Sequence, residues 1–250
     1  MINILLNGCN GKMGQEFTNT VAKYHDLKIV AGVNPSGQQK NDYPVFESIM
    51  ECTADFDVLV DFSIAESIDD VLAFSLQKNK PIFVGTTGHT KIQKEKMKEC
   101  SNSIPIFLCA NTSFGINILL EITKKVAFLL GDDFDIEIIE KHHNQKVDAP
   151  SGTSLLIANA VNEVLSNYEY IYDRHSKLEK RSKNEIGIHS IRGGTYPGEH
   201  TIIFAGNDEI LEIKHTALSK SIFAEGAIKI VKYIFKKPAG LYSMQDLISL

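Results

Sequence analysis

Residues 2–14 have the sequence INILLNGCNGKMG, in which a short apolar run leads into three glycines at intervals of three, Gly8, Gly11 and Gly14. Glycines at the mouth of a helix permit a tight turn and let backbone N–H groups approach a pyrophosphate. A glycine triplet alone is a weak signal. One that directly follows an apolar strand favours a dinucleotide fingerprint over an ordinary glycine turn.

Apolar runs and helical patterns alternate through the first half of the chain. The apolar runs lie at 2–6, 28–33, 58–61, 81–84 and 104–108, and helical spacing is found at 13–24, 65–78 and 91–100. Short apolar strands spaced by helices indicate a parallel sheet that is buried on both faces. We therefore predict an α/β fold with an N-terminal, Rossmann-like, doubly wound parallel sheet.

The pattern changes after residue 114. The predicted elements are a long amphipathic helix at 115–130, strands at 135–140, 186–192, 200–204 and 209–215, one helix among them at 154–164, and a last helix at 222–235. Strands without intervening helices indicate a mixed or antiparallel sheet. The chain is therefore expected to have a second, α+β domain, in which the polar stretch 175–184 forms a surface loop.

Composition narrows the class of protein. A hydrophobic fraction of 43% with 23% charged residues is ordinary for a soluble globular protein, and the net charge of -5 argues against bulk nucleic-acid binding. No stretch approaches the ~20 apolar residues of a membrane helix, and no secretory leader pattern is present. We expect a cytoplasmic protein with no nucleic-acid or membrane partner. None of the four cysteines has C-x-x-C spacing, which predicts free thiols.

The predicted cofactor site also includes residues that follow the other predicted strands of this sheet. Dinucleotide sites usually place an acidic residue ~20 residues after the glycines, for the adenine ribose, where this chain has Asn34-Pro35. Asn34 can hydrogen-bond a ribose hydroxyl but would not repel a 2′-phosphate, and no arginine lies beside it to bind that phosphate. The sequence therefore does not decide whether the cofactor is NADH or NADPH. The loops 85–88 and 110–113 carry small and hydroxyl residues suited to a nicotinamide ribose and carboxamide, although each alone could be ordinary turn chemistry.

Residues 140–154, EKHHNQKVDAPSGTS, combine a proton donor, a cation and backbone donors. His142 and His143 are consecutive, so on an extended chain their side chains point to opposite sides, and an imidazolium can act as a general acid near neutral pH. Lys146 adds positive charge. The segment 151–153 precedes a predicted helix, whose N–H groups can hold a carboxylate or be capped by a hydroxyl. Adjacent histidines rarely ligate one ion, so no metal is expected.

These motifs together resemble the 4-hydroxy-tetrahydrodipicolinate reductase family. The resemblance rests, in chain order, on GCNGKMG, VGTTGHT, CANTSFGIN, EKHHNQKVDAPSGT, IGIHSIRGGTYPGEHTIIFAG and IKHTALSKSIFAEGA, and it runs from about residue 2 to about residue 240. It implies an enzyme of the diaminopimelate route to lysine that reduces a cyclic imine dicarboxylate with NADH or NADPH. Hydride reaches ring carbon C4, the 4-hydroxyl is lost as water, and a proton is supplied to C3.

By motif position the resemblance implies roles for individual residues. His142 corresponds to the proton donor, and Lys146 corresponds to the cation that binds substrate and stabilises charge in the transition state. His143, Gly152 and Thr153 correspond to contacts of the substrate carboxylates. The implied cofactor contacts are Gly8, Cys9, Asn10, Gly11, Lys12, Met13, Gly85, Thr86, Thr87, Cys109, Ala110, Asn111 and Thr112.

The resemblance also implies a domain layout and an assembly. Residues 1–113 and 217–250 would form the dinucleotide-binding domain, and residues 114–216 would form the substrate-binding and oligomerisation domain of a homotetramer. The chain departs from many relatives at two places. Asn34-Pro35 replaces an acidic residue that is often followed by arginine, and Lys220 replaces an arginine, which exchanges a forked donor for a point donor.

Two other classes of function compete with this reductase. A nicotinamide-binding sensor without turnover would keep the glycine turn but would need neither His142 nor Lys146. A related reductase could act on another imine or on an aldehyde. An acyl-enzyme mechanism for an aldehyde would need a nucleophilic cysteine, for which Cys109, at a predicted strand end, is the candidate.

Overall fold

The structure is a computed structural model that describes residues 1–248, with Asp132 described by its backbone alone. The chain divides into two compact units, Met1–Ser113 with Ser221–Leu250, and Phe114–Lys220. The chain returns to the first unit at Ser221 rather than at 217. The reason is that strand β11 (Ile210–Ala217) is longer than predicted and helix α6 (Ser221–Ile234) begins only after it.

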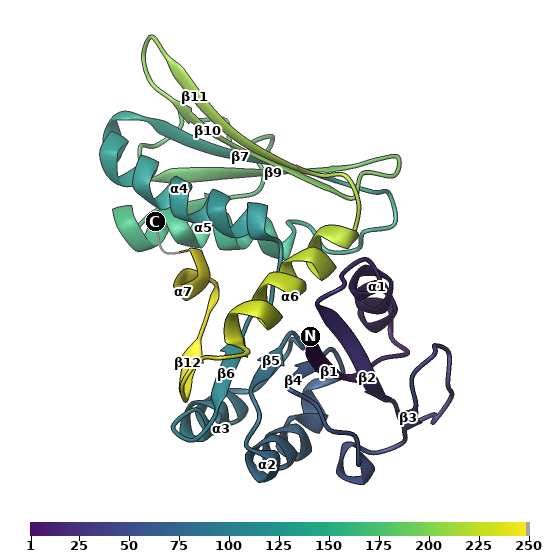
Figure 1. The fold of residues 1–250 in the computed structure, drawn as a ribbon. Coiled ribbons are helices and arrows are strands. Elements are labelled where there is room, and N and C mark those ends of the chain that lie inside the picture. The colour runs from purple at the N-terminus through teal and green to yellow at the C-terminus, as the bar shows by residue number, and fades with distance from the viewer. Residues whose placement is uncertain (249–250) are drawn as a thin grey trace. The chain divides into compact units, whose positions relative to one another are not determined.

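Seven parallel strands form the sheet of the first unit (Figure 1). In spatial order they are β12 (Gly240–Tyr242), β6 (Pro105–Leu108), β5 (Ile82–Val84), β4 (Val58–Asp61), β1 (Ile2–Asn7), β2 (Leu27–Val33) and β3 (Val45–Phe46). The chain runs from β1 outward to β3 and then restarts at β4, on the other side of β1. The switch point between β1 and β4 is where ligands of such sheets bind. The doubly wound parallel sheet predicted from the sequence is confirmed.

Helices cover both faces of this sheet (Figure 1). They are α1 (Lys12–Val21), α2 (Ile68–Lys78), α3 (Lys91–Cys100) and α6. The unit also contains the short helix α7 (Met244–Ile248) after β12 and the 3₁₀ turns η1 (Ile49–Glu51) and η2 (Ala65–Ser67). α1 packs against α6, and α2 packs against α3. Because both faces are covered, β4 is buried along its whole length. Within residues 1–248, no helix is both long and apolar enough to cross a membrane.

The second unit contains one mixed sheet of five strands. In spatial order they are β11, β10 (Gly198–Ala205), β7 (Asp135–His142), β9 (Glu185–Arg192) and β8 (Glu169–Ile171). β10 is antiparallel to β11 and β7, whereas β9 is parallel to β7 and β8. Helices α4 (Phe114–Leu130) and α5 (Gly152–Leu165) cover one face (Figure 1), and the turn η3 (Gly131–Asp133) follows α4. The predicted mixed sheet of an α+β domain is confirmed.

On the helix-covered face of this sheet, strand β7 carries apolar side chains along its first half and polar side chains at its end. Side chains alternate along the strand, and the buried ones are Ile136, Ile138, Glu140 and His142. The strand does not end at 140 as predicted, because His142 still pairs with Arg192 on β9. His142 is therefore a strand residue that the sheet holds in place, and the loop begins only at His143.

Candidate active site

The turn after β1 needs its glycines for steric reasons. Gly8 has φ +79°, and a Cβ there would lie 2.4 Å from the carbonyl oxygen of Phe62. A Cβ at Gly14 would lie 2.3 Å from the carbonyl oxygen of Gly8. Gly11 is the N-cap of α1 and provides no side-chain hydrogen bond, so the N–H groups of the first helical turn have no capping side chain. This arrangement fits the pyrophosphate of a dinucleotide.

A cavity of about 360 Å³ opens beside this turn. Its walls come from the carboxyl ends of β1 and β2 and from the segment after β4, and they include Gly8, Gly11, Asn34 and Ser63. The cavity therefore lies at the switch point of the sheet. Its volume lies in the range of small-molecule pockets, and its position fits the adenosine half of a dinucleotide.

Asn34, predicted as a ribose contact, lines this cavity with one of its polar atoms already engaged. Its Oδ1 accepts hydrogen bonds from Ser36 N at 3.2 Å and from Ser36 Oγ at 2.8 Å, which forms an Asx turn. Asn10 of the glycine turn donates to the carbonyl oxygen of Gln38 at 2.8 Å and holds this loop in place.

A buried carboxylate, Asp61, joins three strand ends beneath the predicted cofactor loops. Asp61 accepts hydrogen bonds from Asn7 Nδ2 at 2.8 Å, from Thr86 Oγ1 at 2.7 Å and from the Ser63 hydroxyl. Burial raises the pKa of Asp61, and these hydrogen bonds oppose the rise. The sequence prediction missed Asp61, although a single acidic residue at the end of an apolar strand was an available signal. The hydroxyl of Thr86, a residue of the predicted cofactor loop, donates its hydrogen to Asp61.

The loop after β6 is held against α6. Thr112 Oγ1 donates to the carbonyl oxygen of Phe223 at 2.7 Å, and a Cβ at Gly226 would lie 1.7 Å from the carbonyl oxygen of Thr112. The Cys109 thiol donates to the carbonyl oxygen of Asn111 at 3.0 Å, and burial raises the pKa of Cys109 to about 11. A thiol that stays protonated at neutral pH is a poor nucleophile, which argues against an acyl-enzyme mechanism.

The other predicted cofactor residues lie at the same carboxyl edge of the sheet. They are Cys9, Lys12 and Met13 in the glycine turn and the start of α1, Gly85 and Thr87 after β5, and Ala110 after β6. The backbone pairing continues past the strands: Gly85 N donates to the carbonyl oxygen of Asp61 at 2.9 Å. The first unit thus brings its predicted residues together on one edge.

In the second unit, Glu140 and His142 leave β7 on the same face, since they are two residues apart. His142 Nδ1 is hydrogen-bonded to Glu140 Oε2. Arg192 donates to the same carboxylate twice, from Nη1 to Oε2 at 2.8 Å and from Nη2 to Oε1 at 2.7 Å. The opposite ring nitrogen, His142 Nε2, is approached by Gly198, where a Cβ would lie only 3.2 Å away. Glycine at 198 therefore leaves room at this nitrogen.

Burial and neighbouring charges act in different directions on this cluster. Burial would raise the pKa of Glu140, but hydrogen bonds from Arg192 and His142 outweigh it and hold that pKa at about 2. Burial lowers the pKa of His142, and the Glu140 carboxylate only partly opposes this. Burial and the charge of His142 lower the pKa of His200 to about 4. The two imidazole rings meet edge to face, with centroids 5.2 Å apart. Near neutral pH the cluster holds a Glu140 anion and a neutral His200.

The N-terminus of α5 adjoins the same cluster. Ser151 is its N-cap, and its backbone N donates to Glu140 Oε1 at 3.2 Å while its hydroxyl lies 3.1 Å from His200 Nε2. Gly152 and Thr153, predicted to contact substrate carboxylates, are the first residues of the helix. A Cβ at Gly152 would meet nothing within 4 Å, so the start of α5 has open space beside it.

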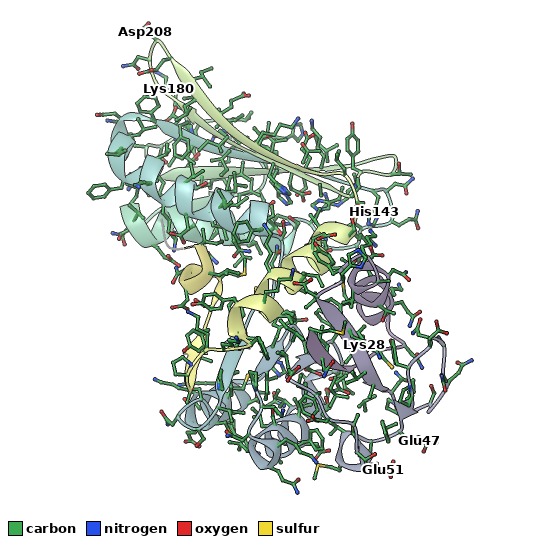
Figure 2. All side chains as sticks on the ribbon, viewed as in Figure 1. Lys28, Glu47, Glu51, His143, Lys180 and Asp208 are labelled. Carbon is green, nitrogen blue, oxygen red and sulfur yellow. The ribbon has the colours of Figure 1, made fainter. Side chains whose placement is uncertain are left out.

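Lys146 lies on the connection from β7 to α5. Its Nζ is 2.8 Å from Asp148 Oδ1, and its positive charge helps to lower the pKa of His142. His143, labelled in Figure 2, is half-buried, and its backbone N donates to the carbonyl oxygen of Tyr196 at 2.9 Å. The structure therefore brings His142, Lys146 and the start of α5 together, while the imidazole of His143 takes no part in the Glu140 network.

Glu140 and three other residues of this cluster were not singled out by the sequence prediction. Arg192, Gly198 and His200 all lie in the segment IRGGTYPGEH, which is far from residues 140–154 along the chain and is joined to them by pairing of β7 with β9 and β10. The carboxylate two residues before His142 was an available signal, because that spacing places both side chains on one face of a strand. Within the part of the chain that the structure describes, no three or more His, Cys, Asp or Glu side chains are grouped so that they could hold a metal ion.

Comparison with known proteins identifies the family. The model of dihydrodipicolinate reductase, N-terminus, matches residues 2–112, and that of dihydrodipicolinate reductase, C-terminus, matches residues 115–248. The 4-hydroxy-tetrahydrodipicolinate reductases of Clostridium novyi and Clostridium tetani are 46% and 47% identical, over 99% and 100% of this chain and 98% of each relative. A dipicolinate-bound dihydrodipicolinate reductase from Paenisporosarcina sp. TG-14 superposes with a TM-score of 0.81 at 26% identity, covering 99% of both chains. The chain therefore belongs to the dihydrodipicolinate reductase family.

Proposed function

We propose that this chain reduces 4-hydroxy-tetrahydrodipicolinate to tetrahydrodipicolinate, with loss of water, in the diaminopimelate route to lysine, using NADH or NADPH. The single observation that carries this proposal is the cluster around Glu140. The Glu140 carboxylate contacts buried His142, Arg192 and the backbone N–H at the start of α5. A proton donor and the N–H groups of a helix N-terminus therefore lie next to each other. The family membership of the chain supports the same reaction.

The first unit would hold the cofactor. The first-turn N–H groups of α1 would bind the pyrophosphate, and the cavity between Gly8 and Asn34 would bind the adenosine. The loops after β5 and β6 would contact the nicotinamide end mainly through their backbone, because the Thr86 and Thr112 hydroxyl hydrogens are donated within the protein. When bound, the dihydronicotinamide supplies the hydride that is added at ring carbon C4.

His142 would donate the proton that is added at C3. Glu140 holds Nδ1 of the imidazole, so Nε2 is the nitrogen that exchanges a proton with substrate. Burial keeps the pKa of His142 below its ordinary value in the free protein. A dicarboxylate bound beside the imidazole would favour the charged form and raise this pKa. Substrate binding would thereby favour protonation of His142, the proposed proton donor.

The substrate carboxylates would be held by cations and helix N–H groups. Lys146 would exchange its contact with the exposed Asp148 carboxylate for a substrate carboxylate and would stabilise charge that develops in the transition state. The start of α5, at Gly152 and Thr153, would bind a carboxylate through its N–H groups. The Paenisporosarcina relative binds dipicolinate, a planar cyclic dicarboxylate, which supports a ligand of this shape.

We further propose that the sheet of the second unit builds a homotetramer. Helices α4 and α5 cover one face of the sheet, and Figure 1 shows the other face of β10 and β11 without a covering helix. Apolar side chains are exposed on this open face, among them Ile191 and Ile210. Sedimentation of the purified chain would test the assembly.

All four cysteines are free thiols, which suits a reducing compartment such as the cytoplasm.

A coupled assay would test the reaction. The preceding synthase would make the unstable substrate from pyruvate and aspartate semialdehyde, and oxidation of NADH and NADPH would be followed separately. The wild type is expected to turn over. His142→Gln should lower kcat strongly with little change in KM, whereas Lys146→Ala should lower kcat and raise KM. Lys141→Ala is the matched control, since this neighbouring ammonium is bound to Glu199 at 2.7 Å. Folded protein that binds a dinucleotide without turnover would favour a sensor or another substrate.

A further inference from the structure

Glu47 stands beside Asn34 at the edge of the cofactor sheet. β3 pairs in parallel with β2, so that Val33 is matched with Phe46, and Asn34 N continues the ladder by donating to the carbonyl oxygen of Phe46 at 2.9 Å. Glu47 is the next residue. Asn34 and Glu47 therefore leave the carboxyl ends of adjacent strands together, and both line the cavity that would hold the adenosine.

The carboxylate of Glu47 lies against the loop that follows Asn34. A Cβ at Gly37 would be 2.9 Å from Glu47 Oε1, which places this oxygen next to the backbone of that loop. The Oδ1 atom of Asn34 is engaged by Ser36. Among residues 1–248, no salt bridge holds the Glu47 carboxylate. Glu47, and not Asn34, thus offers the anionic acceptor on this side of the cavity.

The charged side chains in the wall of the cavity are both acidic. Asp70 of α2 is a second acidic residue in its wall, and no lysine or arginine lines it among the described residues. The sequence has no arginine in residues 1–113 or 221–250. Lys40, on the loop after Asn34, lines a different cavity together with Thr18 and Tyr24. A ribose 2′-phosphate carries a charge of about -1.5 to -2 at neutral pH, like other phosphate monoesters.

We propose that Glu47 selects NADH over NADPH. Its carboxylate accepts hydrogen bonds from the adenine-ribose hydroxyls, the role that an acidic residue at the end of the second strand plays in other dinucleotide sites. It also repels a 2′-phosphate, which would find no cation in this cavity to neutralise it. The acidic residue that is missing at position 34 is thus supplied from the neighbouring strand. This inference rests on the proposed cofactor site.

Direct binding of the two cofactors tests this selection without any substrate. The Kd values of NADH and NADPH would be measured by calorimetry on the whole chain. The wild type is expected to bind NADH at least about tenfold more tightly. Glu47→Gln should bring the two Kd values close together, and Glu47→Arg should favour NADPH, because a guanidinium binds phosphate through two nitrogens.

Two matched variants control for general charge effects. Glu51→Gln removes the same charge from the adjacent turn η1, near Glu47 (Figure 2) but outside the wall of the cavity, and should leave the Kd ratio unchanged. Lys40→Ala should leave it unchanged as well. Equal affinities in the wild type, tighter NADPH binding, or a ratio that Glu47→Gln does not alter would overturn the proposal. No binding of either dinucleotide would overturn both this selection and the cofactor site, whereas selective binding without turnover would count against the reaction alone.

Discussion

Arg192 donates to both carboxylate oxygens of Glu140, with Nη1 2.8 Å from Oε2 and Nη2 2.7 Å from Oε1. The same Oε2 atom contacts His142 Nδ1. Glu140 is completely buried, and the forked contact keeps it as an anion, with a pKa of about 2. An anionic acceptor at Nδ1 requires a proton on that nitrogen, so the tautomer and the orientation of the imidazole are both set by Glu140. Glu140 is therefore a positioning residue for the proposed acid.

The first prediction concerns this role of Glu140. Glu140→Gln keeps the shape of the side chain and removes its charge, so we expect kcat to fall by about 10²–10⁴-fold, the scale seen when the carboxylate behind a catalytic histidine is neutralised. KM should change little. Because Glu140 raises the pKa of His142, its loss should also move the alkaline limb of the kcat–pH profile to lower pH.

The control for this variant lies on the same strand. Glu137 is on the other face of β7, where it contacts His189 and Arg181, so Glu137→Gln removes an equal charge away from His142. This variant should keep both kcat and the pH profile. An unchanged kcat and an unmoved limb in Glu140→Gln would show that the carboxylate only fills space.

The second prediction separates the stability of the Glu140–Arg192 pair from its role in catalysis. Arg192→Gln leaves a buried carboxylate without its forked partner, which should lower the free energy of unfolding by about 3 kcal/mol. The double variant Glu140→Gln, Arg192→Gln carries neither charge and should recover part of this loss. Urea unfolding of the two single variants and the double variant would measure the coupling. Additive effects of the two substitutions would contradict the pairing.

The covered strands were predictable because their patterns are local. Val58–Asp61 is an apolar run that both layers of helices bury, and buried side chains alternate along β7 as far as His142. The two-residue strand β3 has too few residues to show a pattern, and with it the position of Glu47 was missed. The partner of Glu140 was also missed. Arg192 reaches it only through the register of β7 against β9, a long-range pairing that no local spacing contains.

The third prediction is a loss of stability in mild acid. The pKa of His200 is about 4 in the folded chain, below its ordinary 6.5, because burial disfavours the charged ring. Between these two values the unfolded chain takes up a proton that the folded chain does not, so stability falls as pH drops from 6.5 toward 4, by up to about 3 kcal/mol. The lowered pKa of His142 acts in the same direction.

Unfolding free energies at several pH values would check the assignment to His200. His200→Gln should reduce the slope between about pH 6.5 and pH 4, whereas substitution of the exposed His175 should leave it unchanged. The stabilising effect of the Glu140 anion is lost in a lower window, as pH falls from its ordinary pKa of 4.5 toward about 2, and should persist in both variants. An equal slope in His200→Gln and the wild type would contradict the assignment.

The fourth prediction uses the open space beside Gly152. Gly152 is the first residue of α5, and a Cβ added there would meet nothing within 4 Å, so Gly152→Ala should fold normally. Alanine also favours the helix over glycine by up to about 1 kcal/mol. A methyl group at the start of α5 would obstruct a carboxylate that approaches the helix N–H groups. We therefore expect unchanged or higher stability together with about tenfold weaker binding of dipicolinate, measured by calorimetry.

Thr153→Val provides the comparison on the same helix turn. This variant removes the hydroxyl and keeps the backbone N–H groups accessible, so its loss of affinity for dipicolinate measures what the side chain adds to the backbone site. Weak binding by Gly152→Ala with nearly normal binding by Thr153→Val would assign the carboxylate to the N–H groups of α5. If Gly152→Ala bound dipicolinate as tightly as the wild type, the start of α5 would be only the end of a helix, and the carboxylates would have to be held by Lys146 and its neighbours alone.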